Sequence, residues 1–253
     1  MAHTLPPRLD WPYPPRIAHR GAGRLAPENT LAAFEAGARL GWRMFECDAR
    51  LSADGVVFLL HDDTLERTTN GTGPAANWPW AALRALDAGG WHSPRFAGEP
   101  LPTLATVARF CLAHGYCLNI EIKPCPGRAH ETGAAVAREA RRLWSGAAGA
   151  VPPLLSSFQP QALAAAMGAA PELPRGLLLT SLRSDWLATA QSLACVAVVC
   201  EHTQWTGPAV HRTRAAGLRA LAYTVNEASD VARLEAWGID GIISDSVDRL
   251  TPP

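Results

Sequence analysis

Three acidic side chains stand at spacings that suit the binding of a metal ion. Glu46 and Asp48 are two residues apart in a short apolar run, and Glu121 precedes Lys123 by two residues in another. Residues two apart on a strand point to the same face, so each run presents its charged side chains together. A single such pair is compatible with a solvated strand face. Three carboxylates in one cavity need neutralising, and their oxygens suit a hard divalent ion, so we predict a Mg²⁺ or Ca²⁺ site.

Two histidines at the ends of apolar runs are suited to proton transfer. His19 and His61 carry imidazoles, and such a pair can serve as general base and general acid near neutral pH. Arg20 and Lys123 add fixed positive charge, which suits phosphate oxygens. Combined with a divalent ion, these groups predict the cleavage of a phosphate diester.

A short polar segment precedes the first helical pattern of the chain. Its residues 27–30 read Pro-Glu-Asn-Thr, and either Asn29 or Thr30 can cap the helix. Glu28 is placed to reach back toward the turn that follows His19. We expect Glu28 and Asn29 to support the side chains that contact metal and substrate.

The elements that must position these residues alternate between strand and helix patterns. We predict nine strands, at residues 16–19, 44–49, 56–61, 117–123, 154–158, 175–180, 195–200, 218–225 and 241–244. The connection between the second and third is too short for a parallel crossover, so these two form an antiparallel hairpin. The eight remaining strands are expected to run parallel.

Helical patterns follow these strands along the chain. They cover residues 30–40, 104–113, 131–144, 160–167, 185–193, 207–216 and 229–237, with a final stub at 247–250. This α/β alternation and the length of 253 residues predict a (β/α)8 TIM barrel, with an open doubly wound sheet as the alternative. We expect residues 1–253 to form a single domain.

Residues 63–102 do not fit the repeat. They exceed a normal connection and carry several tryptophans, glycines and prolines, so we expect an insertion packed over one end of the barrel. It acts either as a lid or as a structural excursion with its own aromatic cluster.

Composition limits the partners and the compartment. Lysine plus arginine equals aspartate plus glutamate at 23 each, so no overall field attracts nucleic acid or an anionic membrane. The six cysteines form no C-x-x-C pair, and we expect reduced, mostly buried thiols. Prolines interrupt residues 1–16, which argues against a secretory signal. We therefore expect a cytoplasmic protein that acts on a small molecule.

Several short motifs together resemble the glycerophosphodiester phosphodiesterase family, most closely its bacterial cytosolic members that serve glycerol-3-phosphate uptake. The motifs are HRG at 19–21, PENT at 27–30, ExD at 46–48, HDD at 61–63, ERTTNGTG at 66–73, IEIK at 120–123, SSF at 156–158, YTVN at 223–226 and GIDGIISD at 238–245. The resemblance extends from about residue 11 to residue 250.

The resemblance implies a barrel enzyme that hydrolyses glycerophosphodiesters such as glycerophosphocholine and glycerophosphoethanolamine to sn-glycerol 3-phosphate and an alcohol. The roles it implies agree with those inferred above for the metal, the histidine pair and the phosphate contacts. Tyr223 stands where many members have tryptophan, which implies a substrate-binding ring. Residues 63–102 match the inserted subdomain of the family.

Three questions stay open at this point. The nucleophile is either the glycerol 2-hydroxyl, which would give a cyclic phosphate that water then opens, or water itself. A phospholipase of the same architecture is one alternative, but the balanced charge argues against a membrane substrate. A non-catalytic phosphoester-binding barrel is another, and the presence of both histidines argues against it.

Overall fold

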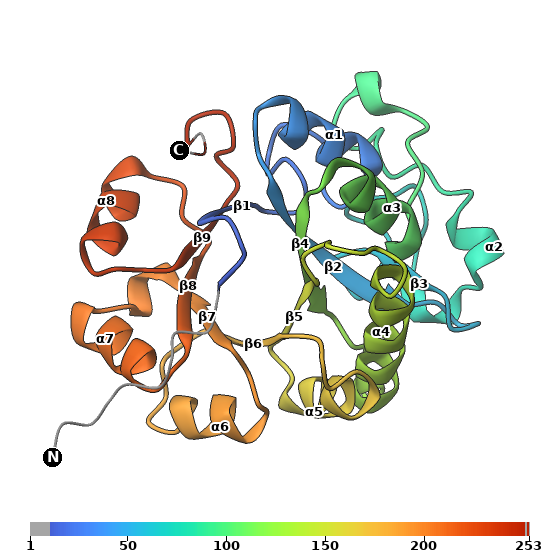
Figure 1. The fold of residues 1–253 in the computed structure, drawn as a ribbon. Coiled ribbons are helices and arrows are strands. Elements are labelled where there is room, and N and C mark those ends of the chain that lie inside the picture. Colours follow the sequence, from blue (N-terminus) through green and yellow to red (C-terminus); the bar gives the residue numbers. More distant parts are fainter. Residues whose placement is uncertain (1–10, 251, 253) are drawn as a thin grey trace, which may run out of the picture.

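Eight parallel strands form a closed ring at the centre of the molecule (Figure 1). The computed structural model, which describes residues 11–250 and 252, orders them β1-β9-β8-β7-β6-β5-β4-β2, and pairing of β1 with β2 closes the ring. Their bounds are β1 Arg16–Ala18, β2 Met44–Leu51, β4 Cys117–Ile122, β5 Leu154–Ser157, β6 Arg175–Leu179, β7 Ala197–Glu201, β8 Arg219–Tyr223 and β9 Gly241–Ser244. The predicted TIM barrel is confirmed, and the open sheet is excluded. Of the N-terminal segment 1–16 considered above, residues 1–10 lie outside the described residues.

The remaining strand, β3 (Val57–Leu59), pairs antiparallel with β2 outside the ring, which confirms the predicted hairpin. It ends earlier than the expected run 56–61. The Nε atom of Arg50 donates to the carbonyl oxygens of Leu60 and His61, at 3.0 and 3.1 Å. Arg50 thereby takes the place of a neighbouring strand for these carbonyls and fixes the backbone that carries His61.

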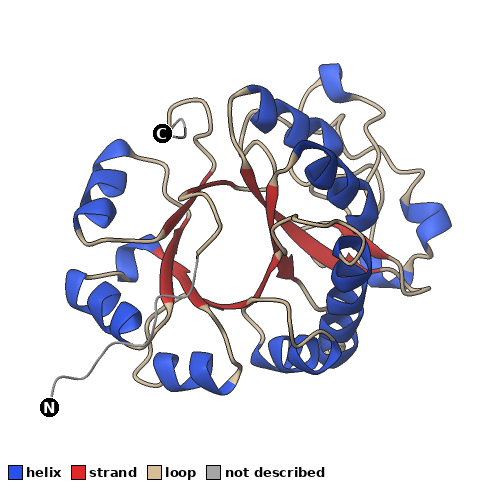
Figure 2. Ribbon diagram, in the orientation of Figure 1, coloured by secondary structure: helices blue, strands red, loops and turns tan. Residues whose placement is uncertain are grey.

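Helices surround the ring (Figure 2). Those that follow the barrel strands are α1 Leu31–Arg39, α3 Leu104–His114, α4 Ala129–Trp144, α5 Pro160–Ala169, α6 Trp186–Ser192, α7 Gly207–Ala215 and α8 Ala228–Ala236. A 3-10 turn, η3 (His202–Gln204), joins β7 to α7.

The helical stub predicted at residues 247–250 is wrong. The N–H groups of Arg249 and Leu250 both donate to the carbonyl oxygen of Ser246, at 3.1 and 2.9 Å. Two donors that converge on one carbonyl make a turn, whereas a helix needs a succession of bonds to carbonyls along the chain. The chain therefore leaves β9 through a turn.

The strands are buried on both sides, because side chains alternate between the barrel interior and the helices. On β2, Cys47 and Ala49 pack with the helices, whereas Met44 packs in a second cluster with residues of the other barrel strands. Glu46 and Asp48 share the interior parity of Met44. The barrel interior is thus apolar near the amino ends of the strands, and the acidic residues lie nearer their carboxyl ends.

The insertion 63–102 lies beside β3, outside the ring (Figure 1). It contains η1 (Ala75–Asn77), α2 (Trp80–Leu83) and η2 (Pro94–Phe96). Its buried side chains, among them Leu65 and Leu83, pack against Phe58 of β3. It therefore has a small apolar core of its own, and Arg67 near its start reaches the mouth of the barrel.

Within the described ranges, no helix combines the length and the apolar character that crossing a bilayer requires. All six cysteines are free, and five of them are buried, as expected of reduced thiols.

Candidate active site

The three acidic residues predicted to bind a metal converge in the barrel. Each offers one carboxylate oxygen, and the three oxygens lie within 4.8 Å of one another. Asp48 on β2 is the register partner of Glu121 on β4, and Glu46 lies two residues earlier on β2. All three are buried. The alternation of side chains along two neighbouring strands therefore builds one acidic cluster.

The three acids of this cluster lie close together, with too few positive charges nearby for all of them to ionise easily. Burial raises the pKa of Glu46 well above its ordinary value, and the charge of Asp48 adds to the shift. Burial and Asp48 also raise the pKa of Glu121 to about 7. Burial opposes ionisation of Asp48 too, but the positive charges of Arg20 and Lys123 outweigh it and lower the pKa of Asp48.

The cluster also contains oxygens that need a partner. The Oε1 atom of Glu46 and the Oδ1 atom of Asp48 are buried and accept no hydrogen bond from any residue in the described part of the chain. Leaving such an atom without a partner is costly, and a hard divalent cation would satisfy both. The acidic residues therefore fit a metal ion by number, type and spacing.

His19 follows β1 and is held by an acid that the sequence reasoning did not identify. Its Nδ1 atom lies 2.6 Å from the Oδ1 atom of Asp245, which follows β9. The backbone N–H of Asp245 donates to the side-chain oxygen of Asn226 at 2.9 Å. The other ring nitrogen, Nε2, lies 3.8 Å from Oε2 of Glu46. One side of the imidazole is thus anchored, and the other faces the acidic cluster.

His61 occupies the opposite side of the cluster. Its Nε2 atom lies 3.0 Å from Nζ of Lys123, and its Nδ1 atom lies 2.6 Å from Oδ1 of Asp62. A lysine ammonium can only donate, so Nε2 is the acceptor and the ring proton sits on Nδ1, facing Asp62. Burial is the main cause that lowers the pKa of His61; the charges of Arg20 and Lys123 act in the same direction, against the opposing effects of Asp48 and Asp62. His61 is therefore a neutral imidazole in this arrangement.

Arg20 joins the acidic cluster to the loop before α1. Its backbone is in the left-handed region, with φ of 50°, and its N–H donates to Oε2 of Glu46 at 3.1 Å. Its guanidinium donates to Oε1 of Glu28 at 2.9 Å and forms an ion pair with Asp48, Nε to Oδ2, at 3.3 Å. Few non-glycine residues adopt this backbone conformation, and here the bond to Glu46 helps to hold it.

The structure distinguishes between the two capping candidates. The side chain of Thr30 caps α1 by accepting from the N–H of Ala33. Asn29 instead turns inward, donating from Nδ2 to Oδ2 of Asp48 at 2.8 Å and accepting from the N–H of Asp48 at 3.0 Å. Asn29 therefore fixes the orientation of an acidic residue, as expected of a supporting side chain.

A cavity of about 150 Å³ opens above the cluster. The residues that line it are His19, Arg20, Glu46, His61, Asn119, Glu121, Lys123, Phe158, Leu178, Tyr223, Thr224 and Ile243. The lining combines acidic and basic side chains with the rings of Phe158 and Tyr223. The ring of Tyr223 meets that of Phe158 edge-on at 5.8 Å, and its hydroxyl donates to the carbonyl oxygen of Leu179 at 3.0 Å.

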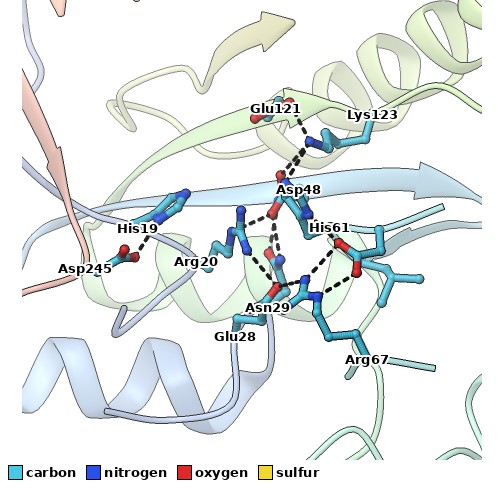
Figure 3. A network of polar contacts seen from close by, with 12 residues as sticks. His19, Arg20, Glu28, Asn29, Asp48, His61, Arg67, Glu121, Lys123 and Asp245 are labelled. Atoms are coloured by element: carbon cyan, nitrogen blue, oxygen red, sulfur yellow. Dashed lines mark hydrogen bonds and ion pairs between the residues drawn. The ribbon is translucent and has the colours of Figure 1, made fainter. Parts of the chain in front are cut away.

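The structure thus brings together every residue predicted for the site. Figure 3 shows several of them converging from different strands and loops. Sequence reasoning missed Asp245, Asp62 and Arg67, although each belongs to a motif already quoted. An acid directly after the last barrel strand was the available signal for Asp245, because active sites of this fold lie at the carboxyl ends of the strands. The acidic cluster can bind a cation, and Arg20 and Lys123 can bind an anion. His19 and His61, on opposite sides of the cluster, can transfer protons.

Comparison with known proteins agrees with this chemistry. Residues 19–249 match the model of the glycerophosphoryl diester phosphodiesterase family. A glycerophosphodiester phosphodiesterase from Caldanaerobacter subterraneus subsp. tengcongensis is 31% identical over 242 residues, covering 92% of this chain and 95% of that protein.

Solved structures agree as well. A phosphodiesterase from Oleispira antarctica, in complex with its product sn-glycerol 3-phosphate, is 35% identical with a TM-score of 0.88, covering 94% of this chain and 95% of that one. A glycerophosphodiester phosphodiesterase from Agrobacterium tumefaciens is 30% identical with a TM-score of 0.79, covering 93% of this chain and 97% of that one.

Proposed function

The chain belongs to the glycerophosphoryl diester phosphodiesterase family, and on that basis we propose that it hydrolyses glycerophosphodiesters to sn-glycerol 3-phosphate and an alcohol. Glycerophosphocholine and glycerophosphoethanolamine are the proposed substrates. The observation that carries the proposal is the convergence of Glu46, Asp48 and Glu121 between His19 and His61. We propose that the reaction serves glycerol and lipid metabolism in the cytoplasm, where six unpaired cysteines would stay reduced.

The acidic cluster would hold one divalent cation, Mg²⁺ or Ca²⁺. When bound, the cation would supply positive charge close to the phosphate oxygens, where negative charge develops during the reaction. Glu46, Asp48 and Glu121 are the residues that would bind it, and the buried oxygens of Glu46 and Asp48 that accept no hydrogen bond from the described residues support this assignment.

Arg20 and Lys123 are proposed to bind the phosphate. Both line the cavity, and their charged groups approach Asp48 from two sides, at 3.3 and 3.8 Å. Fixed positive charges placed in this way favour a phosphate and the extra charge of its transition state. The rings of Tyr223 and Phe158 would contact the carbon skeleton of the substrate.

We assign the general base to His19 and the general acid to His61. As the attacking oxygen, of water or of the glycerol 2-hydroxyl, bonds to phosphorus, it loses its proton to His19, and the carboxylate of Asp245, 2.6 Å from the ring, stabilises the imidazolium that forms. On the second route, water then opens the cyclic phosphate to give sn-glycerol 3-phosphate. The bond from phosphorus to the departing alcohol oxygen breaks as that oxygen takes a proton from Nε2 of His61. Since the neutral ring holds its only proton on Nδ1, His61 first takes up a proton from solvent and acts as the imidazolium. Lowering of the pKa of His61 makes its protonated form a stronger acid toward the alkoxide.

Replacement of the histidines tests this proposal. His19→Ala and His61→Ala should each lower kcat for glycerol 3-phosphate release by at least about 100-fold. Metal affinity, measured by calorimetry, should stay unchanged. His114→Ala is the matched control, since His114 is exposed on α3 and its ring bonds the carbonyl oxygen of Phe110. Near-normal turnover of His61→Ala would exclude its role, and product binding without turnover in the unaltered protein would favour a phosphoester-binding barrel.

A further inference from the structure

Arg67, in the ERTTNGTG segment, has no role in the function proposed so far, yet it contacts two acids of the site at once. Its Nε and Nη2 atoms donate to the two carboxylate oxygens of Asp62, at 2.6 and 2.9 Å. Its Nη1 and Nη2 atoms donate to the two oxygens of Glu28, both at 2.8 Å. One guanidinium therefore bridges two carboxylates through paired hydrogen bonds, a geometry that a lysine cannot reproduce.

Each of these acids holds a different functional side chain. Asp62 contacts Nδ1 of His61 at 2.6 Å, and Glu28 accepts from Nη1 of Arg20 at 2.9 Å. Asp62 thus links Arg67 to the proposed general acid, and Glu28 links Arg67 to a proposed phosphate ligand. Figure 3 shows Arg67 with Glu28, Arg20 and His61 in this network.

The path through Glu28 and Arg20 and the path through Asp62, His61 and Lys123 both end at Asp48. Arg20 forms an ion pair with Asp48 at 3.3 Å, and Lys123, which contacts His61, approaches the same carboxylate at 3.8 Å. The contacts therefore form a closed circuit in which acidic and basic groups alternate, except that His61 and Lys123 are neighbours. Such a circuit restrains each member from two sides, which an isolated surface ion pair does not do.

The backbone beneath Arg67 is itself well fixed. Leu65 is buried and its N–H donates to the carbonyl oxygen of Gly73 at 3.1 Å. Thr69 donates from its hydroxyl to the carbonyl oxygen of Leu65 at 2.7 Å and accepts from the N–H of Gly71 at 3.0 Å. The segment that carries Arg67 is therefore anchored to the core of the insertion. A small shift of that core would move Arg67 relative to Asp62 and Glu28.

We propose that Arg67 is a positioning residue that sets the orientation of His61 and Arg20 relative to each other, so that the insertion contributes to catalysis without touching substrate. This inference rests on the function proposed above. The positive charge of Arg67 also balances the negative charges of Asp62 and Glu28. Without Arg67, these two acids would no longer be held in the positions from which they contact His61 and Arg20. The hydrogen bonds from Arg67 to Glu28 and Asp62 raise the pKa of the guanidinium, in agreement with a strongly bound charge.

Kinetics of Arg67→Met and Arg67→Lys test the proposal. Misalignment of reacting groups is expected to lower kcat for glycerophosphocholine by about 10- to 100-fold in both variants. Arg142→Met is the matched control, since Arg142 forms a similar paired contact with Glu139 on the exposed side of α4. The variants and the control should have similar melting temperatures, and the affinity for Mg²⁺ should be unchanged because Arg67 contacts none of the three metal-binding acids.

A second measurement reports on the ring of His61 directly. Nitrogen-15 NMR of the unaltered protein should show a single neutral tautomer with the proton on Nδ1, whereas Arg67→Met should show a mixture. Wild-type kcat in Arg67→Met and Arg67→Lys together with an unchanged tautomer would overturn the proposal. Absence of glycerol 3-phosphate release from the unaltered protein would instead count against the proposed function, and the NMR comparison would then decide the role of Arg67. Arg67→Lys serves the same measurements should Arg67→Met fail to fold.

Discussion

The Nδ1 atom of His19 lies 2.6 Å from the Oδ1 atom of Asp245, although 226 residues separate them in the sequence. Closure of the barrel brings them together, because β1 pairs with β9 and the two residues follow the carboxyl ends of these strands. The contact fixes one nitrogen of the imidazole and leaves the other toward the acidic cluster. Asp245 is therefore the residue that would orient His19 for its proposed role as a base.

Asp245→Asn should lower kcat about 100-fold or more, because an amide in place of the carboxylate favours the wrong tautomer and cannot stabilise the imidazolium. Stopped assays of glycerol 3-phosphate release measure the effect. Asp230→Asn is the control, since the Oδ2 atom of Asp230 lies 3.8 Å from Nδ1 of His202, and neither residue lines the cavity. Equal activities of the two variants would remove Asp245 from the mechanism.

Glu46→Gln and Glu121→Gln should each weaken the binding of Mg²⁺ or Ca²⁺ by at least about 10-fold, since an amide supplies a neutral oxygen in place of a charged one. Isothermal titration calorimetry gives the affinity. Glu139→Gln provides a control on α4, where Glu139 is half-buried, lies outside the cavity and pairs with Arg142. An unchanged titration in both variants would place the cation elsewhere.

The buried acids Glu46 and Glu121 should make the metal-free protein less stable as pH rises, against a smaller pH range in which the lowered pKa of His61 acts in the opposite direction. Burial raises the pKa of Glu121 to about 7 and that of Glu46 in the same direction, so between the unfolded and folded pKa values the folded state holds more protons. That contribution to stability is complete below the unfolded pKa and is lost as pH passes the folded pKa. Asp48, whose pKa is lowered, contributes no dependence in this window.

Melting temperatures with EDTA or with Mg²⁺, measured from about pH 5 to about pH 8, check this expectation. The stabilisation by Mg²⁺ should grow with pH, because the cation replaces protons on buried acids. A stabilisation that is constant across the range would contradict it.

Tyr223→Ala should raise KM for glycerophosphocholine by about 10-fold, because it removes apolar wall from the cavity. Tyr223→Phe should have a much smaller effect, since the hydroxyl already donates to the carbonyl oxygen of Leu179 and is not free for substrate. Steady-state kinetics separates KM from kcat. Equal increases in KM for the two variants would show that the hydroxyl, rather than the ring, serves the substrate.

Local pattern was sufficient for most of the barrel and for the acidic cluster. The spacing of Glu46 and Asp48 fixes their common face, and the short connection to β3 permits only a hairpin. The stub at 247–250 was mispredicted because a few residues of helical composition do not determine whether successive hydrogen bonds form.

Contacts between distant segments were not predictable in this way. Asn29 and Thr30 were equivalent capping candidates in the sequence, and the nearby carboxylate of Asp48 is what draws Asn29 inward. The pairing of His19 with Asp245 depends on closure of the ring. The bridge from Arg67 to Glu28 depends on how the insertion packs. None of these has a periodic signal along the chain.

The release of sn-glycerol 3-phosphate from glycerophosphocholine and glycerophosphoethanolamine, with and without a chelator, tests the central claim most directly. The structure leads us to expect release that EDTA abolishes and that added Mg²⁺ or Ca²⁺ restores. Release that is indifferent to the chelator, or no release from either diester in the presence of both cations, would contradict a metal-dependent phosphodiesterase centred on Glu46, Asp48 and Glu121.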